Sequence, residues 1–283
     1  MTGGWAPRLF LLSVGGILAM PAIRRGDIMR RQVDKVAVVI PCYNEEAGIA
    51  NVIKGFDKHE LLRSGYELDI IVVDNNSSDQ TANIARAAGA RVVVERNRGK
   101  GNALCTGFSS VDSNTSYVVM LDGDDTYNPK EILRLLEPLR NNFCDVIIGS
   151  RLGGKMHDGS MPAFNRLGNW LYTMLVRQCY RASVTDVLTG YFAWKRPVIE
   201  ELAPYLTSPG FAIEMEMITK MARLGYEIYS VPISYHPRSG ESNLHPIRDG
   251  YRILKMFTRN LRWLPEVATP ADVEADVEVV SET

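Results

Sequence analysis

Short apolar segments alternate with amphipathic segments from residue 35 onward. The apolar segments are rich in β-branched residues and too short for typical helices, which predicts buried strands. The strands predicted in the first half are Lys35–Ile40, Asp69–Val73, Arg91–Val94, Tyr117–Leu121 and Asp145–Ile148.

Between these strands, apolar residues recur at the spacing of an α-helix. The first predicted helix follows Asn44, whose side chain can cap it. Its apolar face consists of Ile49, Val52, Ile53 and Phe56. A second helix is predicted over Thr81–Ala88. A third opens at Asn128-Pro129, because proline is well tolerated in the first turn.

The rest of the chain is less regular. Segment 98–109 contains glycines and is assigned no element. The elements predicted in the second half are helices Phe164–Tyr180, Ala212–Arg223 and Pro246–Leu264, and strands Tyr191–Trp194 and Glu227–Ser234.

Alternation of strands and helices predicts an α/β fold, a mainly parallel sheet flanked by helices with right-handed crossovers. We expect one domain over residues 33–264, preceded by an N-terminal tail, residues 1–32. Residues 265–283 carry acids and no basic residue, and few side chains that could form a core. This tail is therefore expected to be disordered.

Composition narrows the class of protein. The chain has 283 residues, 46% of them hydrophobic, which suffices for a sizeable core. Its formal net charge of −1 provides no basic field, so nucleic acid is not an expected partner. The four cysteines form no CxxC pair, which indicates a reducing compartment without a disulfide framework.

The N-terminal tail allows three interpretations. The apolar run Leu9–Ile23 is shorter than the roughly 20 residues of a membrane span, so it would be a weak anchor. It has the length of a signal-peptide core, but its cleavage site is poor. Alternatively, translation begins at Met29, directly before the first strand.

Polar residues cluster directly after three of the predicted strands. The clusters are Pro41–Glu45, Asp74–Ser77 and Asp122–Asp125. In open α/β sheets, ligands bind at the carboxyl ends of the strands. Three clusters on one edge therefore predict a single site.

Asp122 and Asp124 form a carboxylate pair separated by one residue. Adjacent carboxylates repel each other, and a hard divalent cation such as Mg²⁺ or Mn²⁺ relieves the repulsion. The alternative is a solvated turn, which is what an isolated DxD usually marks. An EF-hand is excluded because the DxDxDG spacing is absent.

Asp74 is the candidate for recognising a nucleotide. A carboxylate at a strand end can accept hydrogen bonds from a base or ribose. The competing interpretation is that this segment only caps the next helix, through Ser78 or Asp79. Neither GxGxxG nor GxxxxGK[ST] occurs, which disfavours a nicotinamide enzyme or a P-loop ATPase.

Five motifs in order carry a family resemblance: VIPCYNEE, IIVVDNNSSDQTA, RNRGKGNAL, MLDGDDTYNP and VIIGSR. Together they resemble family 2 glycosyltransferases with the Rossmann-like GT-A fold. Within that family the chain is most similar to the dolichol-phosphate mannosyltransferase and polyprenyl-phosphate glycosyltransferase group. The resemblance implies an inverting, metal-dependent transfer from a nucleotide-diphospho-sugar.

The same resemblance implies roles for individual residues. It places the nucleotide sugar on Pro41, Tyr43, Glu45, Asp74, Asn76, Lys100, Asp122 and Gly123. It places the metal, Mg²⁺ or Mn²⁺, on Asp122 and Asp124. Asp186 falls in VTDVLTGYFAWKR, which resembles the family's acceptor-side segment. Glu214 and Glu216 fall in GFAIEMEM, which resembles the helix that follows that segment in the family. The chain departs from the family pattern at three positions, Asn75, Thr126 and Asn243.

The acceptor can be a lipid phosphate or a hydroxyl. A hydroxyl needs a general base, for which Asp186 or Glu216 would serve. A lipid phosphate is already anionic at pH 7 and needs cations instead, for which Arg151 and Arg238 are the candidates. We favour polyprenyl or dolichyl phosphate as acceptor and GDP-mannose as donor, with UDP-sugars as alternatives.

The last predicted helix bears on location. Its apolar stripe is Ile247, Tyr251, Leu254, Phe257 and Leu261. A parallel basic stripe is Arg248, Arg252, Lys255, Arg259 and Arg262. This arrangement suits an anionic bilayer surface, and equally a core-packing helix with a solvated edge. We expect a peripheral enzyme at the cytoplasmic face of the membrane; the alternatives are a soluble glycosyltransferase acting on a hydroxyl and an inactive nucleotide-sugar binder.

Overall fold

The computed structural model describes residues 33–240 and 244–265. The interpretations of residues 1–32, of Asn243 and of the acidic tail beyond residue 265 fall outside these residues. The described chain forms a seven-stranded sheet in the order β3-β2-β1-β4-β6-β5-β7. Its strands are β1 (Asp34–Cys42), β2 (Tyr66–Asp74), β3 (Arg91–Val94), β4 (Tyr117–Leu121), β5 (Val146–Met156), β6 (Tyr191–Lys195) and β7 (Ile228–Tyr235).

The predicted α/β class and the mainly parallel sheet are confirmed. β6 is the exception, because it pairs antiparallel with both β4 and β5. It lies in the middle of the sheet, and residues 184–190, the first part of the acceptor-side motif (residues 184–196), therefore reach the carboxyl end of β4.

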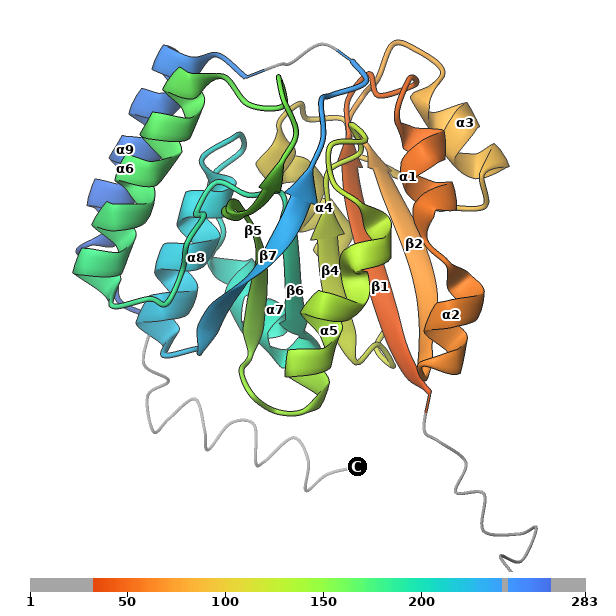
Figure 1. The fold of residues 1–283 in the computed structure, drawn as a ribbon, viewed down its shortest axis with the longest axis horizontal. Coiled ribbons are helices and arrows are strands. Elements are labelled where there is room, and N and C mark those ends of the chain that lie inside the picture. Colours follow the sequence, from red (N-terminus) through yellow and green to blue (C-terminus); the bar gives the residue numbers. More distant parts are fainter. Residues whose placement is uncertain (1–32, 241–243, 266–283) are drawn as a thin grey trace, which may run out of the picture. The chain divides into compact units, whose positions relative to one another are not determined.

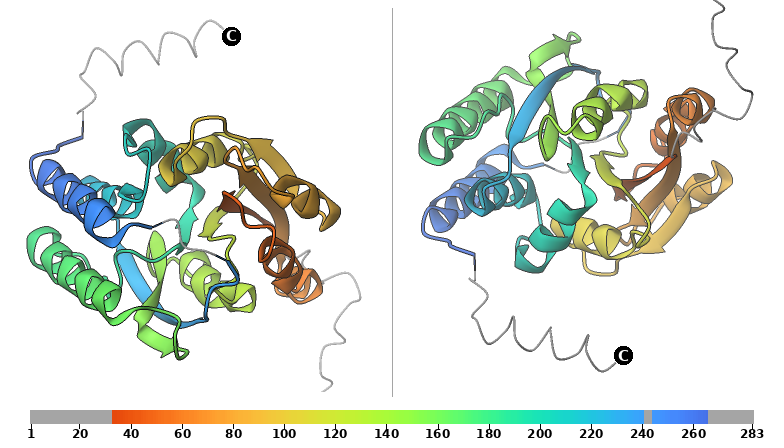
Figure 2. Two further views of the ribbon diagram at one scale, coloured as in Figure 1. Left: turned by 90° about the horizontal axis from the view of Figure 1, so that it is seen from above. Right: turned by 90° about the horizontal axis from the view of Figure 1, so that it is seen from below.

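Helices cover both faces of the sheet (Figures 1 and 2). One face packs against α1 (Ile49–Gly55), α2 (Lys58–Arg63), α3 (Thr81–Ala87) and α5 (Ile132–Arg140), which follows the 3-10 turn η1 (Pro129–Glu131). The other packs against α4 (Lys100–Ser109), α6 (Ala163–Tyr180), α7 (Arg196–Leu202), α8 (Ile213–Leu224) and α9 (Pro246–Asn260), with the 3-10 turn η2 (Ala203–Tyr205) after α7.

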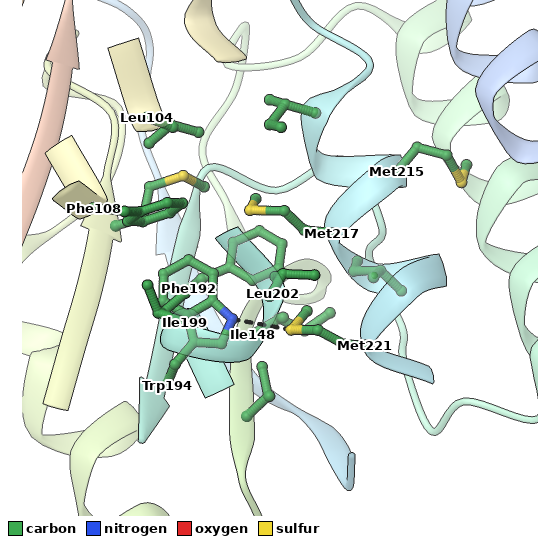
Figure 3. Packing of buried hydrophobic residues seen from close by; sticks show 14 of the residues in the cluster. Leu104, Phe108, Ile148, Phe192, Trp194, Ile199, Leu202, Met215, Met217 and Met221 are labelled. Atoms are coloured by element: carbon green, nitrogen blue, oxygen red, sulfur yellow. Dashed lines mark hydrogen bonds between the residues drawn. The ribbon is translucent and has the colours of Figure 1, made fainter. Parts of the chain in front are cut away.

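Trp194 of β6 centres the core beneath the second group of helices (Figure 3). Its ring stacks on Phe192 with centroids 5.2 Å apart and meets Phe108 of α4 edge-on at 5.7 Å. Its indole N–H points at Met221 Sδ of α8, 3.2 Å away. These contacts fasten α4 and α8 to the centre of the sheet, below the strand ends where the polar clusters lie.

Local expectations failed in three places. Asn44 does not cap α1; it adopts a left-handed φ of 55° and its side chain accepts the backbone N–H of Ser78. Segment 98–109, assigned no element, contains the helix α4. The short helices α2 and α7 were not predicted, because six or seven residues hold too little periodicity to be recognised.

Candidate active site

A cavity of about 360 Å³ opens at the carboxyl ends of β1, β2 and β4. The predicted residues that line it are Pro41, Tyr43, Glu45, Lys100, Asp122, Gly123, Asp124 and Arg238. The predicted residues outside its lining are Asp74, Asn76, Arg151 and Asp186. The structure thus brings residues of all three strand-end clusters to one cavity, but only Asn75 of the cluster Asp74–Ser77 lines it.

Lys100, the first residue of α4, bridges two carboxylates. Its Nζ lies 2.6 Å from Asp122 Oδ1 and 2.6 Å from Glu214 Oε1. Burial opposes the charge on Lys100, but these two carboxylates raise its pKa above the ordinary value. Burial in turn raises the pKa of Glu214. The lysine is therefore a fixed positive charge beside the carboxylate pair.

Asp124 is held by Thr126, two residues further along the chain, and by Arg238, which follows β7. Its Oδ1 accepts hydrogen bonds from the Thr126 hydroxyl at 2.6 Å and from the Thr126 backbone N–H at 3.2 Å. Arg238 Nη1 lies 3.5 Å from Asp124 Oδ2, and Arg238 Nη2 pairs with Glu45. Thr126, one of the departures from the family pattern, supports Asp124 and does not line the cavity.

The ion-pair network of the cavity carries an excess of negative charge. Four carboxylates (Glu45, Asp122, Asp124 and Glu214) share two cations, Lys100 and Arg238. Burial, partly countered by Arg238, raises the pKa of Glu45 to about 7. Burial and the neighbouring Asp122 raise the pKa of Asp124. A divalent cation would relieve the repulsion between Asp122 and Asp124, so this carboxylate pair fits Mg²⁺ or Mn²⁺.

The carboxylate pair would share such an ion with other ligands. Within residues 33–240 and 244–265, no group of three or more His, Cys, Asp or Glu side chains is arranged to hold a metal. Mg²⁺ is commonly held by one or two carboxylates and completes its shell with water and substrate phosphates. The geometry therefore matches a site that forms fully with a phosphate ligand present.

Asp74 lies beside the cavity as the last residue of β2, in register with Cys42 of β1. Its carboxylate is buried, and Oδ1 has no hydrogen-bond partner among the described residues. A buried acceptor without a partner is costly, which makes it a candidate for a donor group on a ligand. Asn76, which also lies outside the cavity lining, occupies a left-handed turn with φ 60°.

Asn75 fastens the loop that follows β3 to the cavity. Its Nδ2 donates to the carbonyls of Glu95 and Asn97, and its Oδ1 accepts the N–H of Gly99 at 2.6 Å. An ionised aspartate accepts hydrogen bonds only, so it could not make the two donor contacts. This departure from the family pattern thus has a structural role: it positions Arg98, whose guanidinium lies 4.4 Å from the centre of the Tyr43 ring.

Arg151 and Asp186 form a buried ion pair with each other. Nε and Nη2 of Arg151 each lie 2.8 Å from an Asp186 oxygen, and the backbone N–H of Arg151 adds a third bond of 2.8 Å. Asn169 of α6 donates to Asp186 as well, at 2.6 Å. Burial would raise the pKa of Asp186, but Arg151 brings it below the ordinary value. Asp186 is fully buried and saturated with donors, which does not suit a base that must reach substrate.

Glu216 is also unavailable as a base. It is fully buried and accepts from Thr207 and from the backbone N–H of Ser208 at 2.7 Å. Its remaining partner is Lys220, at 2.7 Å. These contacts fix the segment 207–211 over the start of α4, where the Pro209 carbonyl accepts the N–H groups of Gly101 and Asn102.

Sequence reasoning missed several residues of the site. The other lining residues are Cys42, Asn75, Arg98, Gly99, Ala103, Phe211, Leu244 and Arg248. Arg98 and Phe211 lie within motifs that were recognised, but their contribution depends on how distant loops meet. Gly190 was also missed: a Cβ there would lie 2.0 Å from Asp122 Oδ2. The acceptor-side motif therefore reaches the site through a glycine, whereas Asp186 lies away from the cavity lining.

Curated relatives share most of the chain. Glycosyltransferase AglJ of Haloferax volcanii is 36% identical over 229 residues, covering 80% of this chain and 72% of that protein. A dolichyl-phosphate hexose transferase of the same organism is 33% identical, covering 80% and 93%. Undecaprenyl-phosphate mannosyltransferase of Micrococcus luteus is 30% identical, covering 74% and 87%.

Solved structures share the fold. Glucosyl-3-phosphoglycerate synthase of Mycobacterium tuberculosis, crystallised with Mn²⁺, UDP and glucosyl-3-phosphoglycerate, superposes with a TM-score of 0.63 at 24% identity. The match covers 83% of this chain and 82% of that one. This likeness confirms the expected GT-A arrangement. The family model for glycosyl transferase family 2 matches residues 37–203. The chain therefore belongs to glycosyl transferase family 2 and is a glycosyltransferase.

Proposed function

We propose that this enzyme transfers a sugar from a nucleotide-diphospho-sugar to a polyprenyl phosphate at a membrane surface, assisted by Mg²⁺ or Mn²⁺. Relatives at 33% and 30% identity are named for transfer to dolichyl phosphate and undecaprenyl phosphate, which supports the acceptor class. The fold neighbour crystallised with Mn²⁺ and UDP supports the metal and the kind of donor.

The observation that carries the proposal is the number of cationic side chains that line the cavity. Four cationic side chains line the cavity: Arg98, Lys100, Arg238 and Arg248. Asp186 and Glu216, the two carboxylates considered as bases, are both buried in ion pairs. A hydroxyl acceptor would need a base, whereas a phosphate monoester arrives ionised. The site thus suits two phosphate-bearing substrates.

Each group in the cavity has a role in this proposal. Asp122 and Asp124 would hold the divalent cation, which supplies charge neutralisation for the diphosphate leaving group. Lys100 holds Asp122 in place through their 2.6 Å ion pair. Arg238, now paired with Glu45 and Asp124, is placed to exchange these partners for donor phosphate oxygens.

The transfer needs no proton transfer from the protein. An oxygen of the acceptor phosphate attacks the anomeric carbon, and the bond from that carbon to the diphosphate oxygen breaks. The electron pair leaves with the nucleoside diphosphate, so charge is conserved and the anomeric configuration inverts. The protein contributes alignment of the two phosphates and stabilisation of the departing charge.

The nucleotide would lie against β1 and β2. The unpartnered Asp74 Oδ1 offers an acceptor for an N–H or O–H of the base or ribose. Tyr43 and Arg98 present an aromatic face and a guanidinium plane at the same edge. GDP-mannose is our preferred donor, on the family resemblance, and UDP-sugars are the alternative.

Transfer of radiolabel tests the proposal. The purified enzyme is incubated with a panel of GDP- and UDP-sugars, polyprenyl phosphate and Mg²⁺ or Mn²⁺, and label is counted in the organic phase. We expect one donor to label the lipid, and chelation by EDTA to abolish the label. Consumption of donor without lipid labelling would instead indicate a hydroxyl acceptor, and no consumption with any donor would indicate a nucleotide-sugar binder.

Gly190→Ala will impair catalysis while leaving the fold intact. The new Cβ would lie 2.0 Å from Asp122 Oδ2, so the carboxylate must move. A misplacement of about 1 Å in an active site can cost about 100-fold, and we expect kcat/KM to fall by roughly that factor. Thermal unfolding should change little, because the displaced atoms end a side chain. Gly168→Ala is the matched control, since nothing lies within 4 Å of its added Cβ.

A further inference from the structure

Helix α6 is amphipathic in the reverse sense, because its exposed face is the apolar one. Phe164 and Trp170 are 66% and 51% exposed. The exposed apolar residues of the helix are Phe164, Leu167, Trp170, Leu171, Met174 and Leu175. They recur three or four residues apart and therefore share one side of the helix. A monomer in water gains nothing from such a face.

Polar contacts hold α6 in this orientation. Asn169, buried on the inner side, donates to Asp186 and accepts the N–H of Leu188. The hydroxyl of Thr173 accepts the N–H of Val187 at 3.2 Å. Rotating the helix to bury its apolar side would break these bonds and leave the Arg151–Asp186 pair incomplete. The outward apolar face is thus built into the fold.

Helix α9 adds a second exposed apolar stripe. Ile247 and Tyr251 are 83% and 68% exposed, and Leu254 is exposed one turn further on. The stripe predicted from sequence ran on through Phe257, but the structure divides it: Phe257 packs in the core with Ile253 and Met256. The helix therefore packs on the core through some residues of the predicted stripe and presents others, Ile247, Tyr251 and Leu254, to solvent.

The two helices lie side by side (Figures 1 and 2). The Tyr172 hydroxyl of α6 donates to the Gly250 carbonyl of α9 at 2.8 Å. We call the exposed apolar residues of both helices the α6–α9 face: Phe164, Leu167, Trp170, Leu171, Met174, Leu175, Ile247, Tyr251 and Leu254. Basic residues of α9 border it: Arg248, Arg252, Lys255 and Arg259.

We propose that the α6–α9 face docks on an anionic lipid bilayer, with α6 supplying most of the apolar contact and α9 the charge. Large apolar and aromatic side chains bordered by arginine and lysine suit the boundary between headgroups and acyl chains. The basic border complements anionic headgroups, whereas two copies of the face would bring like charges together. The inference rests on the proposed function for its biological purpose, but the surface can be tested without it.

The face is continuous with the cavity. Arg248 lines the cavity, and its neighbour Ile247 belongs to the exposed face. Asp249, which is buried, anchors this first turn of α9 by accepting the N–H of His245 at 2.9 Å and pairing with Arg252. A phosphate at the headgroup level would thus meet the cavity within one helical turn, while its lipid chain stays in the bilayer.

Vesicle binding by the full chain tests the docking. The protein is sedimented with phosphatidylcholine vesicles and with vesicles containing phosphatidylglycerol. The Leu167→Ser/Leu171→Ser variant removes two side chains of the face. Leu62→Ser/Phe143→Ser is the matched control, because these apolar residues are similarly exposed on α2 and before β5. Leu167 and Leu171 would be buried in the bilayer when the protein docks, so their replacement should lower partitioning on anionic vesicles by at least about tenfold. The control variant should bind as the parent protein does.

A charge variant separates the two contributions. Arg252→Glu/Lys255→Glu should abolish the preference for anionic vesicles. Equal vesicle binding by the parent protein and the α6 variant, Leu167→Ser/Leu171→Ser, would overturn the proposal. The same holds if only deletion of residues 1–28 from the parent protein abolishes binding. If the parent protein is a dimer that does not bind vesicles and the α6 variant is a monomer, the face is instead an interface with a second copy of the chain.

The enzymatic readout distinguishes this inference from the proposed function. With acceptor embedded in vesicles, the α6 variant should lose about tenfold in transfer rate, in line with its reduced partitioning. With a short-chain, water-soluble polyprenyl phosphate it should match the parent protein. Vesicle binding without transfer to either acceptor would refute the proposed function and leave the docking surface standing.

Discussion

Replacing Asp186 with alanine will destabilise the protein by about 3–5 kcal/mol, because it leaves the buried Arg151 guanidinium without its counter-charge. Three of the bonds that hold the carboxylate come from Arg151 and one from Asn169. Urea unfolding followed by circular dichroism measures the loss. Asp158→Ala, in a turn beyond β5, serves as the control and should change the free energy of unfolding by less than about 0.5 kcal/mol.

The same variant decides whether Asp186 acts as a base. A positioning role predicts that the remaining folded enzyme keeps the pH profile of kcat/KM. If Asp186→Ala unfolds like the parent protein but loses the acidic limb of the pH profile of kcat/KM, Asp186 acts as a base on the acceptor and the buried-pair interpretation is wrong.

At low pH the parent protein and Asp186→Ala should become similar in their free energy of unfolding. Arg151 lowers the pKa of Asp186 in the folded state, so the carboxylate contributes stability above its unfolded-state pKa of about 3.9. This contribution is lost as the pH falls through the lower folded-state pKa. The difference in unfolding free energy between the two proteins should therefore be constant near pH 6–7 and shrink below about pH 4.

Asp124→Ala will abolish metal-dependent transfer, with kcat/KM falling by about 1,000-fold or more. Removal of one strong electrostatic contact to a developing charge typically costs a factor of 100–1,000, and here a metal ligand is lost as well. Without metal, the variant should be no less stable than the parent protein, since burial and Asp122 both oppose the charge on Asp124. Addition of Mn²⁺ with a nucleoside diphosphate should raise the Tm of the parent protein but not that of the variant.

Asp125→Asn is the matched control for Asp124. Asp125 adopts a left-handed φ of 65°, which asparagine tolerates, and it does not line the cavity. Its Oδ2 accepts from Asn51 at 2.9 Å, a contact that the amide oxygen can keep. Equal losses in both variants would show that the loop conformation matters, and would remove the case for Asp124 as a metal ligand.

The centre of the sheet was predictable because strands such as β1 and β4 are short apolar runs buried on both faces. Val36–Ile40 of β1 is fully buried, and the sequence shows it as an unbroken apolar segment. The placement of the polar clusters then followed from topology alone, since parallel strands end at the same edge. Glu45, Asp122 and Asp124 meet in the cavity for this reason.

Features that depend on pairing across the chain were not predictable. The antiparallel direction of β6 leaves no mark on its five residues, and helix α4 begins in a glycine-rich segment of low periodicity. Arg151 and Asp186 each resembled a site residue in its motif, and only the fold shows that they pair with each other across 35 positions. The reverse amphipathicity of α6 is likewise invisible, because a helical pattern does not say which face points inward.

The carbonyl of Pro209 has a thermodynamic consequence. Many nucleotide-binding proteins place phosphate on the free N–H groups at a helix N-terminus. At the start of α4 the Pro209 carbonyl already occupies two of these N–H groups, those of Gly101 and Asn102. Under the proposed function, the diphosphate must draw its compensation from side chains and the divalent ion. Donor and metal would therefore raise each other's affinity for the enzyme by the same factor. The concentration of free metal in the cell would then determine what fraction of the enzyme has donor bound.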